Sequence, residues 1–154
     1  MPRVLIVGIG NPLRSDDGVG LLVAQELFRE LPAHGDVRVI ATQQLTPEIA
    51  EFASYVERVL FVDAADGGEP GSLICRKISP GESSGHYSHE LSPVMILQLA
   101  KKLYGRCPPA YLITAAGANF DTGDTMSTAV SAAIPALKAK IEQMTSFEDV
   151  DVEG

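Results

Sequence analysis

The sequence places two carboxylates and an imidazole at positions that an α/β fold would bring to one edge of its sheet. Asp17 belongs to an acidic pair with Asp16 after the first apolar run of the chain. Asp63 ends the most strand-like run, and His89 lies in a loop ahead of a helical pattern. The carboxyl ends of parallel strands meet at one edge, and ligands bind in the crevice there. Two Asp and one His in that crevice would form a metal site suited to Zn, Mn, Fe or Ni more than to Ca or Mg.

Each of these side chains also has an ordinary structural interpretation. Either Ser15 or Asp16 can cap the helix that follows, and Asp17 would then favour the positive end of that helix. One helix cap needs only one acid, so capping does not explain why two carboxylates are adjacent. Asp63 could be an acid held by N–H groups of a neighbouring loop, because an unpaired buried carboxylate is costly. A single loop histidine such as His89 is commonly just solvated.

The acidic pair lies within a glycine-rich stretch that joins a strand to a helix. Residues 4–7 form an apolar run, and residues 19–31 repeat apolar side chains at helical spacing. Gly8, Gly10, Gly18 and Gly20 frame the turn between them. This arrangement predicts that Asp17 sits where the carboxyl end of a strand meets the amino end of a helix.

The rest of the chain alternates between strand and helix patterns. Strands are predicted at residues 37–41, 59–65, 73–78 and 111–116, and helices at 47–58, 92–104 and 126–144. This alternation predicts an α/β fold, a three-layer α/β/α sandwich with a mostly parallel twisted sheet of about five strands. Residues 59–65 are apolar on both faces and belong in the middle of the sheet. Residues 73–78 carry Arg76 and Lys77 and belong near an edge.

Two helix starts carry recognisable capping signals. Thr46 and Pro47 predict a capping hydroxyl followed by a proline at the first helical position. Ser92 and Pro93 repeat this pattern, and Gly105 marks the end of the helix that they begin.

Composition favours one globular domain. The 154 residues are 45% hydrophobic with a formal net charge of −8, which disfavours disorder and a general affinity for nucleic acid. The apolar run near the amino terminus is too short for a secretory core or a membrane span. Cys75 and Cys107 lack metal-ligand or redox spacing and read as reduced thiols. We expect a cytoplasmic monomer with one domain over residues 1–147 and an acidic tail over 148–154.

Gly81-Glu82-Ser83-Ser84-Gly85 matches the nucleophile elbow of serine hydrolases but lacks its context. That motif needs a strand, a sharp turn and a helix, followed along the chain by an acid and a histidine. Here no helix begins until about Ser92, and the only later histidines are His86 and His89. We therefore reject a serine nucleophile.

Two further patterns resemble known motifs only locally. Asp121-Thr122-Gly123 matches the aspartic-protease triplet, but those enzymes pair two such loops across a shared proton. Here the triplet leads into a helix and reads as a turn and cap. Gly8-x-Gly10 begins like a dinucleotide fingerprint, but Leu13 takes the third glycine position and the second strand lacks the ribose-binding acid. We expect no organic cofactor.

The same residues resemble a known protein family. The resemblance rests on four features in order: Gly-x-Gly-Asn, Asp-Asp-Gly-x-Gly, an apolar strand ending in Asp, and a loop His before a helix. In these features the chain resembles the NiFe-hydrogenase maturation proteases, also called hydrogenase expression/formation endopeptidases. The segment from Phe120 to Val130, with Gly123, Met126 and Ser127, resembles the family stretch F-x-x-G-x-x-L-S-x-x-V. The resemblance spans nearly the whole chain.

The resemblance implies an endopeptidase that acts on one protein partner, the precursor of a NiFe-hydrogenase large subunit. Such enzymes remove a short C-terminal extension after nickel insertion, so the nickel is carried by the precursor. The family's metal-binding side chains fall on Asp17, Asp63 and His89, which would contact that nickel and orient the adjacent peptide bond. Asp16 would cap the helix or hold Asp17 in place.

Two other functions remain compatible with these residues. One is a non-catalytic, metal-sensing chaperone for the same precursor, and the other is a small-molecule hydrolase on the same fold. The chain also departs from the family pattern at residues 42–46, which replace a D-G-G-T-type turn, and at residues 116–119, which lack a common proline. Both loops would border the crevice, so these departures bear on substrate choice.

Overall fold

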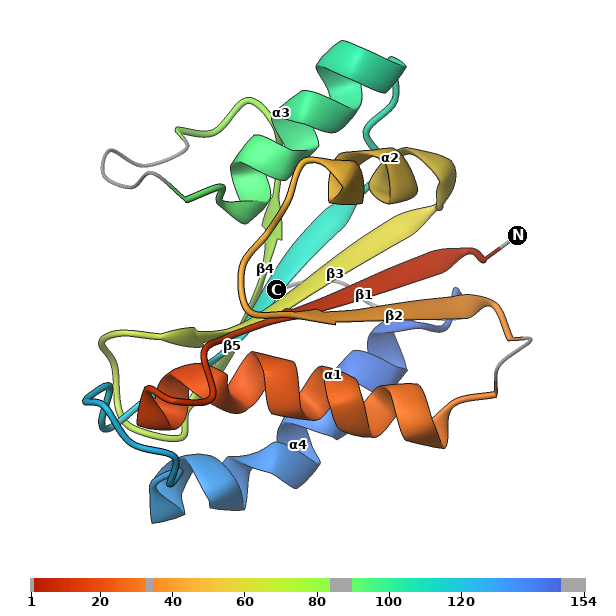
Figure 1. Cartoon of the computed structure of the whole chain (residues 1–154). Helices are drawn as coiled ribbons and strands as arrows, with labels where there is room; N and C mark the ends of the chain where they lie inside the picture. Colours follow the sequence, from red (N-terminus) through yellow and green to blue (C-terminus); the bar gives the residue numbers. More distant parts are fainter. Residues whose placement is uncertain (1, 33–34, 84–89, 148–154) are drawn as a thin grey trace.

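The computed structural model describes residues 2–32, 35–83 and 90–147, which form alternating strands and helices (Figure 1). In chain order, the elements are β1 (Val4–Ile9), the short 3-10 helix η1 (Ser15–Gly18), α1 (Val19–Glu30), β2 (Val37–Thr42), α2 (Glu48–Tyr55), β3 (Arg58–Ala65), β4 (Leu73–Ile78), α3 (Pro93–Tyr104), β5 (Ala110–Ala116) and α4 (Thr128–Met144).

A single five-stranded sheet has the order β2-β1-β3-β5-β4. β1 runs parallel to β2 and β3, β3 runs parallel to β5, and β4 pairs with β5 in the antiparallel sense. The predicted mostly parallel sheet of about five strands is confirmed, as is the edge position of β4. The boundary between a domain over 1–147 and a tail over 148–154 stays a prediction, because the tail lies outside the described residues.

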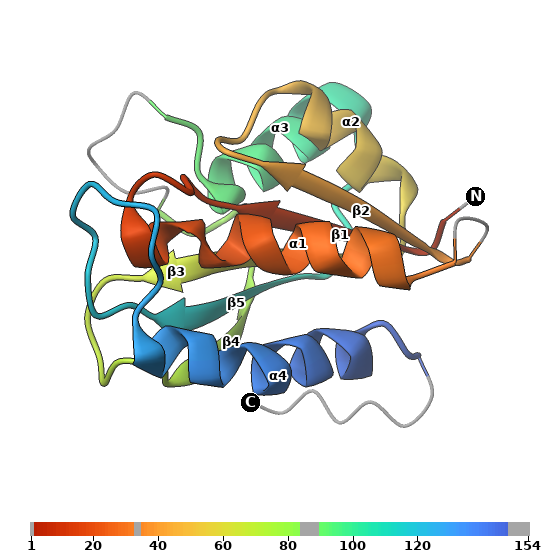
Figure 2. The ribbon, with the colours of Figure 1, turned by 60° about the horizontal axis from the view of Figure 1, so that its bottom comes forward.

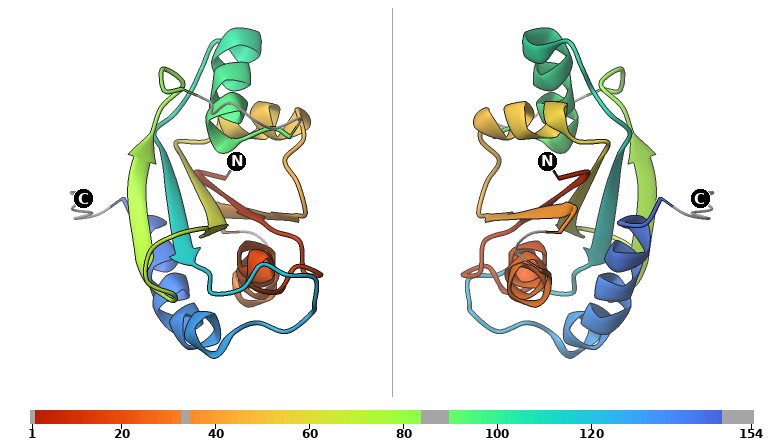
Figure 3. Two further views of the ribbon diagram at one scale, coloured as in Figure 1. Left: turned by 90° about the vertical axis from the view of Figure 1, so that its left-hand side faces the viewer. Right: turned by 90° about the vertical axis from the view of Figure 1, so that its right-hand side faces the viewer.

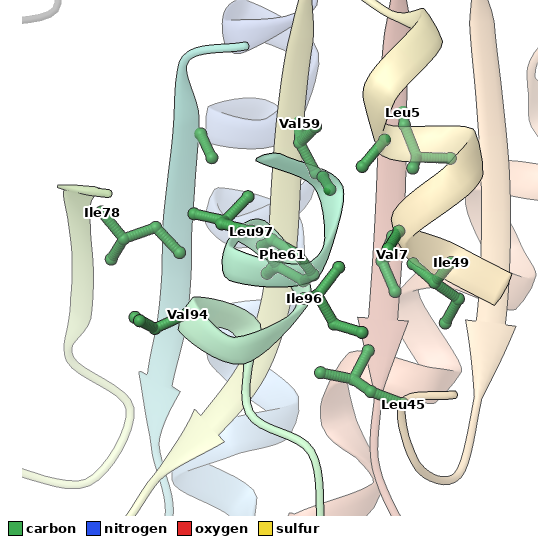
Figure 4. Close-up of a cluster of buried hydrophobic side chains, with 14 of the residues drawn as sticks. Leu5, Val7, Leu45, Ile49, Val59, Phe61, Ile78, Val94, Ile96 and Leu97 are labelled. Carbon is green, nitrogen blue, oxygen red and sulfur yellow. The ribbon is translucent and has the colours of Figure 1, made fainter. Parts of the chain in front are cut away.

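Helices cover both faces of the sheet, which confirms the three-layer sandwich (Figure 3). α2 and α3 pack on one face around Phe61, against which Ile96 and Leu97 of α3 lie (Figure 4). α1 and α4 pack on the other face, where Leu27 and Leu137 are fully buried. β3 lies between these two cores, and its first five residues are buried, as expected of a central strand.

The two predicted capping signals have different outcomes. At α3, Ser92 Oγ accepts a hydrogen bond from Met95 N at 3.2 Å, and Gly105 ends the helix in the left-handed region with φ 73°. At α2, Thr46 makes no side-chain cap, and that prediction is wrong. Pro47 itself occupies the cap position, and the carbonyl oxygens of Thr46 and Pro47 accept the hydrogen bonds of the first turn.

Two helix boundaries also differ from the prediction. α2 ends at Tyr55, three residues before the predicted end at 58, because the backbone is already extended at Val56 and β3 begins at Arg58. α4 begins at Thr128, two residues after the predicted start at Met126, because Ser127 Oγ accepts from Val130 N and caps the helix.

Candidate functional site

The strand order reverses between β1 and β3. From β1 the chain moves outward through α1 to β2, and it then crosses back through α2 to β3 on the other side of β1. In open α/β sheets, ligands bind at the carboxyl ends of the strands beside such a reversal. Asp17 follows β1, and Asp63 lies near the end of β3, one residue beyond the pair Gly8 and Val62. Both predicted acids therefore stand at the reversal point.

Close backbone packing holds the turn that carries Asp17. A Cβ atom on Gly10 would meet the carbonyl oxygen of Asp17, and one on Gly20 would meet the carbonyl oxygens of Ile9 and Val62. The first turn of α1 thus lies directly on the ends of β1 and β3, at an approach that only glycine permits. The glycines of the motif are required because they bring the amino end of α1 onto the sheet.

The Asp17 carboxylate is half-buried and fixes the loop that follows β1. Its Oδ2 atom accepts a hydrogen bond of 2.9 Å from Asn11 N. Asn11 Oδ1 in turn accepts from Leu13 N at 2.9 Å. Among the described residues no other group donates to Asp17, which leaves acceptor positions for a ligand at the sheet edge.

Asp63 is a weak acid in this setting. Burial raises its pKa to about 7, against the opposing effect of the Ala64 N–H, which donates to Asp63 Oδ1 at 2.8 Å. The negative charges of Asp17 and Glu90 contribute further to the raised pKa. A carboxyl group with a raised pKa, close to a second acid at a sheet edge where ligands bind, is typical of a functional site.

The third predicted residue, His89, lies outside the described residues. Its neighbour Glu90 is described, and the charge of Glu90 acts on Asp63. Leu91 forms an antiparallel bridge with Leu45 in the loop after β2. Within residues 2–32, 35–83 and 90–147, no three His, Cys, Asp or Glu side chains are grouped closely enough to hold a metal ion.

Of the two roles predicted for Asp16, capping the helix or holding Asp17 in place, the structure contradicts the first. Asp16 caps neither η1 nor α1, so the capping prediction is wrong. Its fully buried carboxylate instead accepts three main-chain hydrogen bonds from the β5–α4 loop, from Ala118 N (2.7 Å), Asn119 N (3.1 Å) and Ser127 N (2.7 Å). Burial opposes ionisation of Asp16, but these hydrogen bonds, that of Ser127 foremost, outweigh it and lower the pKa. Asp16 therefore remains an anion that ties two loops together.

Ser15 strengthens the same connection. It has φ 53°, a left-handed conformation that is uncommon outside glycine. Ser15 N donates to Gly123 O at 2.8 Å, and Ser15 Oγ donates to Asp121 O at 2.8 Å. Gly123 N returns a hydrogen bond of 2.9 Å to Leu13 O. The turn holding Asp17 is thus joined along its length to residues 118–127, which lie beside it in Figure 2.

Comparison with known proteins gives a consistent result. No protein-family model matches the chain. It is 30% identical over 112 residues to the hydrogenase expression/formation protein HupD of Bradyrhizobium diazoefficiens, covering 69% of this chain and 57% of HupD. The HupD of Rhizobium leguminosarum bv. viciae is 32% identical over 75 residues, covering 47% of this chain and 36% of that protein. The matches thus span about half or less of these curated relatives.

A solved structure extends the match to nearly the whole chain. The NiFe-hydrogenase maturation protease HycI of Thermococcus kodakarensis KOD1 superposes with a TM-score of 0.74 and 28% identity, covering 93% of this chain and 92% of HycI. The chain belongs to the NiFe-hydrogenase maturation protease family. The maturating endopeptidase HybD of E. coli, at 18% identity and a TM-score of 0.68 over 90% of this chain, supports the maturation-protease fold alone.

The geometry explains why this maturation-protease chain carries the stretch from Phe120 to Val130. Gly123 pairs with the loop before Asp17, while Ser127 caps α4 through its hydroxyl and donates its N–H to Asp16. Gly123 and Ser127 within that stretch therefore both hold the acidic turn. Sequence reasoning missed this role of Asp16. The available signal was the adjacent acid itself, since a second carboxylate in one turn needs partners of its own.

Proposed function

We propose that this protein is an endopeptidase that removes a C-terminal extension from the nickel-loaded precursor of a NiFe-hydrogenase large subunit. The observation that carries the proposal is the pair of acids Asp17 and Asp63 at the strand-order reversal of a maturation-protease fold. HycI and HybD are described as maturation protease and maturating endopeptidase. We extend their activity to this chain.

In this proposal, Asp17, Asp63 and His89 are both the metal-contacting and the catalytic residues. They bind nickel that the precursor already holds, so the metal is part of the substrate. Carboxylate and imidazole ligands suit nickel, and the contact would place the adjacent peptide bond at the sheet edge. The position of Glu90 near Asp63 supports the inclusion of His89, its neighbour in the chain.

The weak acidity of Asp63 fits a group that meets its metal only when substrate arrives. With a pKa of about 7, its carboxyl is partly protonated near neutral pH. A carboxyl ligand must lose its proton to bind a metal. Binding of the loaded precursor would therefore release a proton from Asp63, whereas the empty precursor offers no metal to displace it.

Cleavage itself adds one water across a peptide bond. The water oxygen bonds to the carbonyl carbon, the C–N bond breaks, and the leaving nitrogen takes a proton. Nickel beside the bond can polarise that carbonyl as a Lewis acid. The enzyme's share is to hold the loaded precursor so that only the bond next to the metal is cut.

We further propose that the enzyme acts as a monomer in the cytoplasm. Cys75 and Cys107 are free thiols, in keeping with a reducing compartment. No helix in the described part of the chain is long and apolar enough to cross a membrane.

The test is a cleavage assay on nickel-loaded and nickel-free precursor, read as a mobility shift on a gel. Wild type is expected to shorten only the loaded precursor, and Asp17→Asn, Asp63→Asn and His89→Ala are each expected to abolish cutting. Asp66→Asn, an exposed acid beyond β3, is the matched control and retains activity. Binding without shortening would favour the chaperone instead, and equal cutting by the three variants would disprove the assigned site.

A further inference from the structure

β2 forms an edge of the sheet, and a groove runs beside it. Within the part of the chain that the structure describes, β2 pairs only with β1. Two hollows of about 530 and 430 Å³ lie between β2 and α1 and share Phe28 and Val39 in their walls. Phe28 is 68% exposed, the highest value among the large apolar side chains of the described residues. α1 and β2 lie next to each other in Figure 2.

The main chain of β2 offers hydrogen-bonding groups along this groove. The carbonyl oxygens of Asp36 and Thr42 accept from Val4 N and Gly10 N, so the even-numbered residues face β1. In a parallel pair, the main-chain groups of alternate residues point to opposite sides of the strand. Those of residues 37, 39 and 41 therefore face the open edge, and the same three residues line the hollows.

The two edges of the sheet are protected differently. β4, at the far edge, carries Arg76 and Lys77, charges of the kind that discourage strand addition. β2 has no proline, and its one charged residue, Arg38, lies 4.1 Å from the ring of Phe52 on α2. The edge of β2 is thus the one that can accept a further strand.

This open edge leads directly to the site. Gly10 N donates to Thr42 O at the carboxyl end of β2, and the next residue, Asn11, donates to the Asp17 carboxylate. A strand added along β2 would therefore end beside the acidic turn. We propose that the C-terminal extension of the precursor binds there as an added strand, antiparallel to β2. This proposal rests on the proposed function.

The direction follows from where the extension begins. The cleaved bond lies at the carboxyl edge of the sheet, where the acids would hold the precursor's nickel. The extension starts at that bond, so its chain runs from the carboxyl end of β2 toward the amino end. Six residues of β2 span about 20 Å, and alternate side chains of an added strand point to one face. Every second residue of the extension would thus enter the groove beside Phe28, and these residues would be apolar.

The experiment compares two lengths of nickel-loaded precursor, one with its full extension and one with only two residues after the cleaved bond. Phe28→Asp is expected to raise KM for the full-length extension about tenfold or more, as for a central interface residue, with kcat within about twofold. On the shortened precursor, wild type and variant should not differ. Leu103→Asp, at a residue of α3 that is 59% exposed, is the matched control and should behave as wild type.

A substrate-side variant keeps the test independent of enzyme folding. Successive residues of the extension are changed to Asp one at a time, and KM is expected to rise at every second position only. Equal KM values for wild type and Phe28→Asp, or a rise without alternation, would overturn the inference while leaving the proposed function intact. No cleavage by wild type would overturn both. If sedimentation shows a wild-type dimer that Phe28→Asp dissociates, the edge belongs to a second copy of this chain and the inference is wrong.

Discussion

The Oδ1 atom of Asp16 accepts a hydrogen bond of 2.7 Å from Ser127 N, and Ser127 is the residue that caps α4. One buried carboxylate thus connects the turn after β1 to the start of the last helix. Asp17 is its immediate neighbour in that turn. Stability of the loop pair and placement of the proposed metal-contacting acid therefore depend on the same side chain.

Asp16→Asn should destabilise the protein by about 2–4 kcal/mol. The amide lacks the negative charge that strengthens the three N–H hydrogen bonds, and its NH₂ group would face main-chain N–H groups, which it cannot accept from. Cleavage of loaded precursor should fall in kcat more than it changes in KM, since Asp17 loses its support. Urea denaturation and steady-state kinetics measure the two effects. Asp124→Asn, exposed in the same loop, should change stability by less than about 0.5 kcal/mol. An unchanged free energy of unfolding in Asp16→Asn would contradict the connection between the loops.

Asp63→Asn should make the protein more stable at alkaline pH. The folded pKa of Asp63 is about 7 against an ordinary value of 3.8, so between these values the folded state binds more protons than the unfolded state. Stability from this group therefore falls as pH rises from about 4 to 7. At pH 8 the variant should exceed wild type by on the order of 4 kcal/mol, and below pH 4 the two should converge. Urea midpoints from pH 4 to pH 8 test this, and a constant difference across that range would refute the assigned cause.

Gly20→Ala should prevent folding or cost more than about 3 kcal/mol. The added methyl would meet the carbonyl oxygens of Val62 and Ile9, which are backbone atoms of two core strands and cannot move aside. Gly81→Ala is the control, because the nearest atom of the described residues, Ser79 Oγ, lies 4.0 Å from its added Cβ. Circular dichroism and thermal melting should separate the two variants clearly, and similar melting temperatures would argue against the close packing of α1 on the sheet.

Arg58→Met should destabilise the carboxyl end of α4 by about 2–3 kcal/mol. The buried guanidinium donates to Met144 O at 2.7 Å and Ser146 O at 2.9 Å, and it lies 4.2 Å from the ring of Phe147. Loss of a charged donor to buried carbonyls and of a cation–π contact predicts this cost. Arg38→Met removes one exposed ring contact and should cost under about 1 kcal/mol. Equal effects in thermal unfolding would count against this role for Arg58.

Local sequence signals predicted the fold because each acts over a few residues. Ser92, Pro93 and Gly105 mark the two ends of α3, and the structure uses both. Arg76 and Lys77 likewise predicted the edge position of β4 from the composition of that strand alone. Thr46 shows the limit, because a capping hydroxyl is one of several ways to satisfy a helix start, and main-chain oxygens served at α2 instead.

The candidate site could be predicted only in part. Asp17 follows β1 and Asp63 lies near the end of β3. A βα alternation indicates that these strands are parallel, so their common edge was foreseeable. The capping prediction for Asp16 was wrong because its partners lie 102 or more positions later in the chain. No local pattern indicates which distant loop will contact a turn. His89 stays a prediction, since it lies outside the described residues.

The long separation between Asp16 and Ser127 has a consequence for the newly made chain. As the ribosome releases the protein from its amino end, Asp16 emerges before its three partners, which lie 102 or more positions later, and remains hydrated until they follow. The acidic turn can close only when residue 127 has left the exit tunnel, 111 positions after Asp16. A chain that stops before residue 127 therefore has no finished acidic turn, and the proposed protease activity must wait until that segment has been translated.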